Sequence, residues 1–85
     1  MSWTVFITSG ADRRLKRLSR KTYLRIRVVL GEMEHDPWTG DIVKMGGKIN
    51  EWRRRIGAYR IKFKVFEKDR TIQVYEIERR TSTTY

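Results

Sequence analysis

Residues 51–64 read EWRRRIGAYRIKFK and decide the fold, because apolar and basic side chains alternate on both sides of a turn candidate. Gly57 and Ala58 suit a two-residue hairpin loop, whose first position requires the positive φ that glycine adopts freely. Such a turn also sets the register of the two strands. The predicted cross-strand pairs are Ile56 with Tyr59, Arg55 with Arg60, Arg54 with Ile61, Arg53 with Lys62, Trp52 with Phe63, and Glu51 with Lys64.

This register predicts a hairpin with one apolar and one cationic face, because alternate side chains project to opposite sides of a strand. The apolar face holds Trp52, Ile56, Tyr59, Ile61 and Phe63, with Arg54 as its exception. The other face holds Arg53, Arg55, Arg60, Lys62 and Lys64 with one acid, Glu51.

Like charges directly opposite destabilise a sheet by roughly 0.2–1 kcal/mol per pair, so a free fold gains nothing from this arrangement. Phosphate groups would turn the repulsion into charge-assisted contacts, which predicts a polyanion site; a merely solvated basic face is the alternative.

Composition bounds the class of protein. With 85 residues, the chain is expected to form one domain, residues 1–85. Its 20 Lys and Arg against 10 Asp and Glu, a formal charge of +10, indicate nucleic acid, an anionic membrane surface or an acidic protein as partner. No apolar run approaches the ~20 residues of a membrane span, and the start lacks the pattern of a signal peptide, so we expect a cytoplasmic protein.

The sequence argues against metal and thiol chemistry. It contains no cysteine and a single histidine, His35, so it has neither a disulfide nor a cysteine-bearing zinc site nor a set of histidine ligands. No metal or other cofactor is expected. Any reaction must therefore use Arg, Lys, Tyr, Asp or Glu.

The first half of the chain predicts one strand and two helices. Alternation over residues 3–8 is typical of a strand, and Ser9 is a candidate N-cap for a helix over about residues 10–19. A second helical pattern follows, with an apolar face made of Tyr23, Ile26, Leu30 and Met33. Residues 34–47 contain the single proline and three glycines and are predicted to be a loop.

The second half predicts three strands: the hairpin of residues 50–66 and a last strand that contains Ile72, Val74, Tyr75 and Ile77. Apolar positions change parity between Val74 and Tyr75, which indicates a β-bulge or burial on both sides. The element order β-α-α-β-β-β predicts an α+β domain, with a helical hairpin packed on an antiparallel-rich sheet.

Catalytic candidates lie at the end of the last strand. If this strand pairs beside the second strand of the hairpin, Arg79 comes near the cationic face, and Tyr85 can fold back from the tail. Clustered arginines stabilise the charge on a phosphoryl group in transfer. Nearby positive charge lowers the pKa of a phenol from about 10, so Tyr85 is a candidate base, with Lys62 and Lys64 as alternatives. A frayed terminal aromatic and ordinary strand-end charges are the simpler interpretations.

Trp38 and a second run of basic residues can each be explained either by a functional role or by an ordinary structural one. Trp38 is expected to anchor its loop rather than to stack on a base. A second basic run coats the polar sides of the helices, where it could grip nucleic acid or an acidic protein or simply keep the surface soluble; it comprises Arg13, Arg14, Lys16, Arg17, Arg20, Lys21, Arg25 and Arg27.

Together these motifs resemble the RelE/ParE toxin superfamily. The resemblance rests on the element order, on the run Asp-Pro-Trp-Thr-Gly-Asp at residues 36–41 followed by Lys44-Met45 and Gly47, and on residues 52–60. An arginine spaced before the terminal Tyr85 supports it. The similarity covers nearly the whole chain and implies the fold known as the RelE/ParE-like microbial RNase fold.

The resemblance implies the toxin of a type II toxin–antitoxin system. Members of the RelE branch are metal-independent endoribonucleases that cleave mRNA in the ribosomal A site, by attack of the 2′-hydroxyl on the neighbouring phosphate, and so inhibit translation. By similarity, Arg60 would stabilise the transition state, Arg79 would hold phosphate and assist the leaving group, and Tyr85 would act as base or stacking partner. The implied RNA-binding residues are Arg53, Arg55, Lys62, Lys64, Arg80, Lys44 and Lys48. The implied partners are mRNA, the ribosome and a cognate antitoxin, with operator DNA bound only through the antitoxin complex and no membrane.

Two departures from the family pattern are present. Glu78-Arg79 stands where many members carry His-Arg, so Glu78 is either a proton acceptor or a salt-bridge partner, and Glu51 occupies a place where some active members have a cation. The ParE branch shares the fold but poisons DNA gyrase and generally lacks the Arg and Tyr set. A gyrase-binding toxin and a non-catalytic basic module for nucleic acid are therefore the alternative hypotheses.

Overall fold

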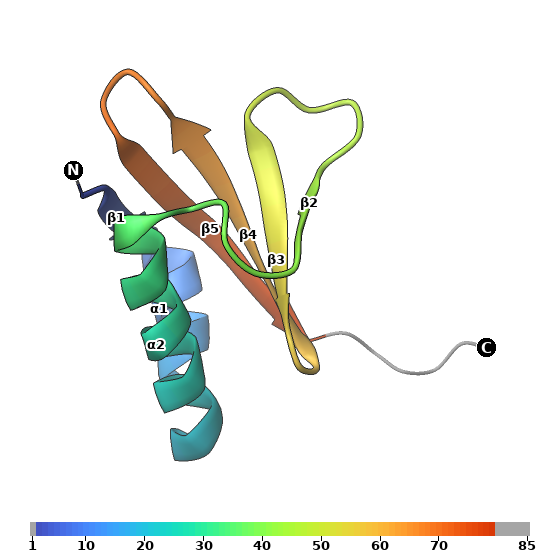
Figure 1. Cartoon of the computed structure of the whole chain (residues 1–85). Coiled ribbons are helices and arrows are strands. Elements are labelled where there is room, and N and C mark those ends of the chain that lie inside the picture. Colours follow the sequence, from blue (N-terminus) through green and yellow to red (C-terminus); the bar gives the residue numbers. More distant parts are fainter. Residues whose placement is uncertain (1, 80–85) are drawn as a thin grey trace.

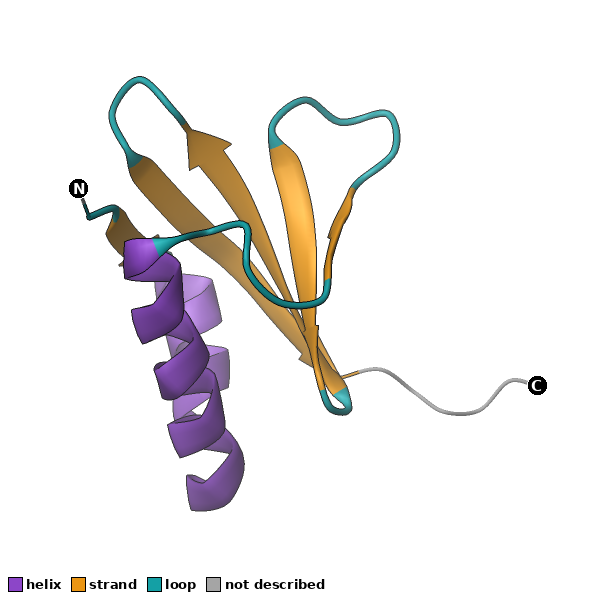
Figure 2. Ribbon diagram, viewed as in Figure 1, coloured by secondary structure: helices purple, strands orange, loops and turns teal. Residues whose placement is uncertain are grey.

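The computed structural model describes residues 2–79, which form one five-stranded sheet with two helices on one of its faces (Figures 1 and 2). The strands are β1 (Thr4–Ile7), β2 (Ile42–Lys44), β3 (Glu51–Ile56), β4 (Tyr59–Phe66) and β5 (Thr71–Arg79). The helices are α1 (Ser9–Lys16) and α2 (Arg20–His35). This α+β architecture confirms the predicted fold class.

The strand order in the sheet is β1-β5-β4-β3-β2, with β1 parallel to β5 and all other neighbours antiparallel. β2 corrects the prediction of a continuous loop over residues 34–47. Three residues are too few to show a strand pattern in the sequence, yet Ile42 pairs with Arg54 and Lys44 with Trp52. The predicted order therefore gains one short edge strand.

The β3–β4 hairpin has the predicted register at all six pairs, from Ile56 with Tyr59 to Glu51 with Lys64. Gly57 has a φ of 57°, the left-handed conformation that the turn requires. The turn thus determines which side chains of both strands share a face.

The bulge predicted in the last strand is also present. Lys62 pairs with Glu76, whereas the next residue, Phe63, pairs with Val74, which leaves Tyr75 as the extra residue of β5. Because of this extra residue, Val74 and Ile77 are both buried although three positions separate them. The bulge reverses the facing of every later residue in β5.

The core lies between the helices and the sheet. α2 contributes Ile26, Val29, Leu30 and Met33, and β4 and β5 contribute most of the remainder, including the fully buried Phe63. The N-cap of α1 is Thr8, whose hydroxyl accepts a hydrogen bond from the Ala11 amide, rather than the predicted Ser9. Ser19 caps α2 in the same way, with its hydroxyl accepting a hydrogen bond from the Thr22 amide, and this cap fixes where α2 begins.

Arg54 is the charged exception on the core face. Its side chain is only 11% exposed, and its Nη2 donates to Glu32 Oε1 at 2.9 Å. A Cβ on Gly40, which has a φ of 86°, would lie 2.5 Å from the Arg54 Cζ, so the guanidinium packs directly against that glycine. The ion pair thereby joins α2, β3 and the connection before β2.

Candidate nucleic-acid interface

The sheet face opposite the helices, here called the outer face, carries the five basic residues that the sequence assigns to one side of the hairpin. The observed register confirms that Arg53, Arg55, Arg60, Lys62 and Lys64 share this face. Arg53, Arg55 and Arg60 line a hollow of about 120 Å³ with Asp41 and Val43.

Carboxylates neutralise part of this face. Lys62 Nζ lies 2.9 Å from Glu78 Oε1 and 3.5 Å from Glu76 Oε1, and Arg55 Nη2 lies 2.9 Å from Asp41 Oδ2. One member of each like-charge pair, Arg55 or Lys62, is therefore engaged by a carboxylate, so the fold itself offsets part of the expected repulsion. The sequence signal was present, because Glu76 and Glu78 are two residues apart on the neighbouring strand.

The ion pairs also bear on the choice of base. The hydrogen bond that Lys62 donates to the Glu78 carboxylate is the main cause that raises the pKa of Lys62 above its usual 10.5. A lysine held in its protonated form is a poor proton acceptor at neutral pH. Glu78 has the salt-bridge role that was one of its two predicted alternatives.

Tyr75, the bulge residue, was absent from the sequence-based site. Its hydroxyl donates to Glu51 Oε1 at 2.7 Å, and Lys64 Nζ lies 5.5 Å from the centre of its ring. Burial, followed by the hydrogen bond to Glu51, raises the pKa of Tyr75 to about 12. Tyr75 therefore stays protonated at neutral pH and holds Glu51 away from the rest of the outer face.

Arg53 and Arg60 are the outer-face arginines that form no ion pair within residues 2–79. They come from neighbouring strands and line the same hollow, and both side chains are half-buried. A buried or half-buried guanidinium interacts more strongly with an anion than one fully in water. These two residues are thus the cations of the outer face most available to a phosphate group.

Arg79 does not lie near the cationic face, so that prediction is wrong. It pairs with Tyr59 on the helix side of the sheet, whereas Glu78 pairs with Arg60. The physical reason is the bulge at Tyr75, which inverts the facing of the strand end.

The other predicted RNA-binding residues are dispersed. Lys44 lies on the Trp52 side of the edge strand β2, with its Nζ 6.0 Å from the Trp52 ring. Lys48 lies in the connection between β2 and β3. The predicted site residues Arg80 and Tyr85 lie outside the described residues.

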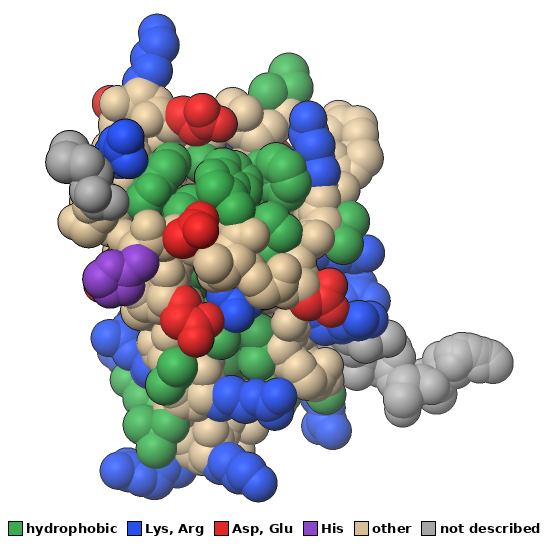
Figure 3. Space-filling view, viewed as in Figure 1, with side chains coloured by type: hydrophobic (Ala, Val, Ile, Leu, Met, Phe, Trp, Pro, Cys, Tyr) green, Lys and Arg blue, Asp and Glu red, His purple; other side chains and the backbone are tan. Residues whose placement is uncertain are grey.

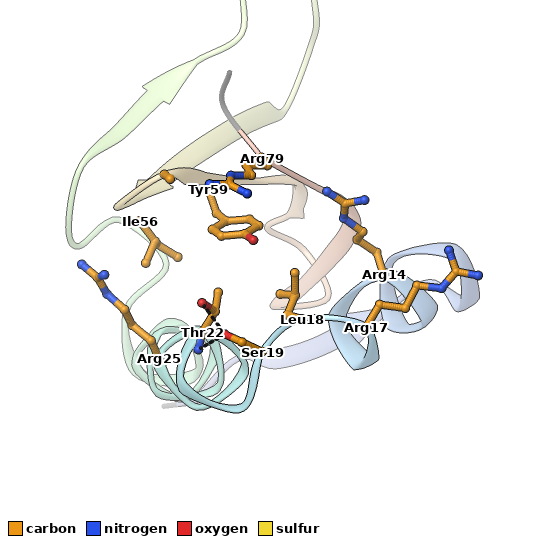
Figure 4. Close-up of a pocket in the computed structure, with 10 residues that line it drawn as sticks. Arg14, Arg17, Leu18, Ser19, Thr22, Arg25, Ile56, Tyr59 and Arg79 are labelled. Atoms are coloured by element: carbon orange, nitrogen blue, oxygen red, sulfur yellow. Dashed lines mark hydrogen bonds between the residues drawn. The ribbon is translucent and has the colours of Figure 1, made fainter. Parts of the chain in front are cut away.

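A second basic site, not predicted as such, lies on the helix side. Its pocket of about 590 Å³ opens between the α1–α2 turn and the β3–β4 turn (Figure 4). We call it the arginine pocket; its lining comprises Arg14, Arg17, Arg25, Arg79, Leu18, Ser19, Thr22, Ile56, Ala58 and Tyr59. Three of these arginines belong to the basic run on the helices, but only the fold brings them beside the hairpin.

Trp38 has the anchoring role expected for it: its ring meets that of Trp52 edge to face, with the ring centres 4.9 Å apart. Across residues 2–79, no group of three His, Asp or Glu side chains has an arrangement suited to a metal ion. Neither α1 nor α2 has the length and apolar character of a membrane-spanning helix.

Comparison with known proteins relates this fold to solved structures. No family model matches the sequence, and no curated protein sequence matches it. The RelE–RelB complex of Pyrococcus horikoshii contains a chain similar to this one, with a TM-score of 0.85, 25% identity and coverage of 98% of this chain and 100% of that chain.

Two further structures are similar at lower identity. A chain of the Mycobacterium tuberculosis RelBE2 complex has a TM-score of 0.83 and 18% identity, covering 94% of this chain and 100% of that one. The isolated Escherichia coli RelE toxin has a TM-score of 0.83 and 13% identity, covering 96% of this chain and 88% of that one. The chain therefore has the fold of the RelE toxins.

Proposed function

We propose that this protein is the toxin of a type II toxin–antitoxin system and acts as a ribosome-dependent mRNA endonuclease. The observation that carries the proposal is the hollow of the outer face on a RelE-like fold, where Arg53 and Arg60 have no ion pair with any other residue from 2 to 79. A phosphate group there meets two guanidinium groups, which bind it through paired, charge-assisted hydrogen bonds.

In the proposed reaction, the 2′-hydroxyl oxygen attacks the adjacent phosphorus, and the bond from phosphorus to the 5′ oxygen breaks. The products are a cyclic phosphate and a 5′-hydroxyl. Arg60 stabilises the negative charge that builds on the phosphoryl oxygens, and Arg53 holds the phosphate in position. Arg55, Lys62 and Lys64 contribute positive potential, although carboxylates or the Tyr75 ring already engage them.

The reaction also requires a base for the 2′-hydroxyl proton and an acid for the leaving oxygen. We assign the base to Tyr85 on the family resemblance, because the pKa values of Tyr75 and Lys62 are both raised and disfavour them. Glu78, directly across from Arg60, is the other proton acceptor at this position. Arg79 lies on the helix side of the sheet and is not assigned a part in this step. Arg80, Lys44 and Lys48 extend the contacts with RNA.

The proposed partners follow from this function. They are the ribosome with mRNA in its A site, a cognate antitoxin that covers or distorts the basic surface, and operator DNA bound only through the antitoxin complex. The RelE–RelB complexes of P. horikoshii and M. tuberculosis support an antitoxin as partner. The proposed compartment is the cytoplasm, and no metal or cofactor takes part.

Cell-free translation tests the proposal directly. The 5′ ends of the message are mapped after addition of the protein, of Arg60→Ala and of the distant surface variant Lys68→Gln. Cuts inside translated codons are expected with the wild type and Lys68→Gln, and about 10²–10³-fold fewer with Arg60→Ala. Cuts that persist in Arg60→Ala would contradict the assigned site. Intact message with the wild type would contradict the nuclease and direct attention to the gyrase hypothesis.

A further inference from the structure

The arginine pocket has the features of an anion site although it lies on the opposite side of the sheet from the outer face. Its four arginines come from three separate elements: Arg14 and Arg17 from the end of α1, Arg25 from α2, and Arg79 from β5. No Asp or Glu lines it, and none of the four forms an ion pair with another residue between 2 and 79. Glu76 and Glu78 line a neighbouring hollow together with Arg14 and Arg79, but within residues 2–79 they form their ion pairs with Lys62 instead.

The side chains surround a partly aromatic floor. Figure 4 shows Arg79 above the Tyr59 ring, Arg14 to the right of it and Arg25 to the lower left, with Arg17 directed outward. Arg25 packs against the hairpin turn, because a Cβ on Gly57 would lie 3.0 Å from its Nη1. Ser19 and Thr22 add hydroxyl groups at the start of α2, where backbone amides and the helix dipole also favour an anion.

Charge continues beyond the pocket. Figure 3 shows Lys and Arg side chains gathered over the end of the molecule where α2 begins, while the acidic side chains in this view lie further toward the other end. A string of phosphates spaced along a strand matches a pocket that opens onto such a surface. Tyr59 offers a partly exposed ring on which a ribose or base can stack beside the phosphate contacts, which favours a nucleic-acid strand as the ligand.

We propose that the arginine pocket is a second phosphate site, which binds the backbone of a single RNA strand independently of the outer face. The inference rests on the proposed function for its choice of RNA as the natural ligand. It assigns Arg14 and Arg25 a binding role and places the phosphate contacts of Arg79 in this pocket.

Binding to a non-cleavable RNA tests the site without any nuclease activity. The probe is a fluorescent single strand of roughly 12 nucleotides with 2′-O-methyl groups, titrated between about 50 and 200 mM salt. Arg14→Gln/Arg25→Gln is compared with Arg27→Gln/Lys68→Gln, which removes the same charge from exposed residues outside the pocket. Circular dichroism checks that both variants remain folded.

The pocket variant is expected to bind about tenfold more weakly and to lower the salt slope by about one more than the control. Arg14→Lys/Arg25→Lys is expected to recover only part of the affinity, because lysine cannot bind phosphate bidentately. Equal losses in the pocket and control variants would overturn the proposal in favour of a general basic surface. A polyglutamate peptide that binds the wild type as tightly as RNA, and loses as much in the pocket variant, would overturn it in favour of an acidic protein.

Failure of this proposal can be told apart from failure of the proposed function. Loss of mRNA cleavage in Arg60→Ala does not depend on the pocket, and the modified RNA reports binding whether or not the protein cleaves.

Discussion

The two faces of the sheet are built from the same strands but differ in polarity: one is apolar and covered by the helices, and the other is charged. On the helix face, apolar side chains exclude water, and the buried guanidinium of Arg54 is accommodated by an ion pair to Glu32. On the outer face, the basic residues of β3 and β4 lie opposite one another, and the acidic residues of β5 offset part of this charge, with Lys62 bridging Glu76 and Glu78. The comparison shows that Arg55, Lys62 and Lys64 already interact with side chains of the sheet and of the segment before β2, whereas Arg53 and Arg60 have no ion pair within residues 2–79 and can bind a ligand.

The largest effect on stability is expected at the centre of the helix face. Phe63 is fully buried, and Phe63→Ala should reduce the free energy of unfolding by about 3–5 kcal/mol through lost burial and the cavity that remains. Urea denaturation measures it, with Lys64→Ala on the outer face of the same strand as control. An equal loss in Lys64→Ala would break the distinction between the two faces.

The ion pair within the helix face should respond to both of its partners. Glu32→Gln is expected to cost about 1–3 kcal/mol, because the Arg54 guanidinium stays largely buried and loses its counterion. The double variant Glu32→Gln/Arg54→Met should regain most of this loss, since an apolar side chain of similar length needs no counterion. Chemical denaturation of the wild type, both single variants (Glu32→Gln and Arg54→Met) and the double variant measures the coupling, and additive effects would contradict it.

The β3–β4 turn determines which side chains share a face, and a Cβ added at its glycine, Gly57, should cause strain. Gly57→Ala is expected to cost about 1–2 kcal/mol because of its positive φ, with the contact to Arg25 as a further strain. Gly31→Ala is the control, because it lies in α2 with no atom within 4 Å of the added Cβ and should stabilise by about 0.5–1 kcal/mol. Thermal unfolding compares both variants, and a loss at Gly31 as large as at Gly57 would contradict this account of the turn.

A smaller effect is expected from Tyr75 at alkaline pH. Its pKa is about 12 in the fold against about 10 in the unfolded chain, so between these values the native state binds more protons. Stability should therefore fall as the pH rises from 10 to 12. The raised pKa of Lys62 acts in the same direction above 10.5.

Tyr75→Phe separates the two contributions. Urea midpoints at about pH 9 and pH 11 should differ less in the variant than in the wild type. The same fall in both proteins would show that Tyr75 does not carry the effect.

Much of the fold followed from local patterns. The hairpin register was predictable because a two-residue turn with glycine admits one pairing, and the bulge followed from the parity change at Tyr75. β2 was not predictable, since Ile42–Lys44 has too few residues for a pattern and depends on pairing with β3.

The site was predicted less completely, for a physical reason that concerns the same bulge. The predicted bulge at Tyr75 reverses which face the later residues of the strand point to. Applied to the end of the strand, this reversal places Arg79 on the helix face. The neutralising role of Glu76 and Glu78 had a signal in their two-residue spacing, but it acts only because β5 pairs with β4. The arginine pocket joins residues from α1, α2 and β5 and has no local signature.

The central claim is that the outer face carries the chemistry and that the arginine pocket binds RNA. Single-turnover cleavage of ribosome-bound mRNA, measured over a range of protein concentrations, tests it most directly. Arg60→Ala should lower the rate at saturation by about 10²–10³-fold and leave the half-saturating concentration nearly unchanged. Arg14→Gln/Arg25→Gln should raise the half-saturating concentration about tenfold and keep the rate at saturation. A saturated rate that survives in Arg60→Ala, or falls equally in the pocket variant, would contradict the division of roles.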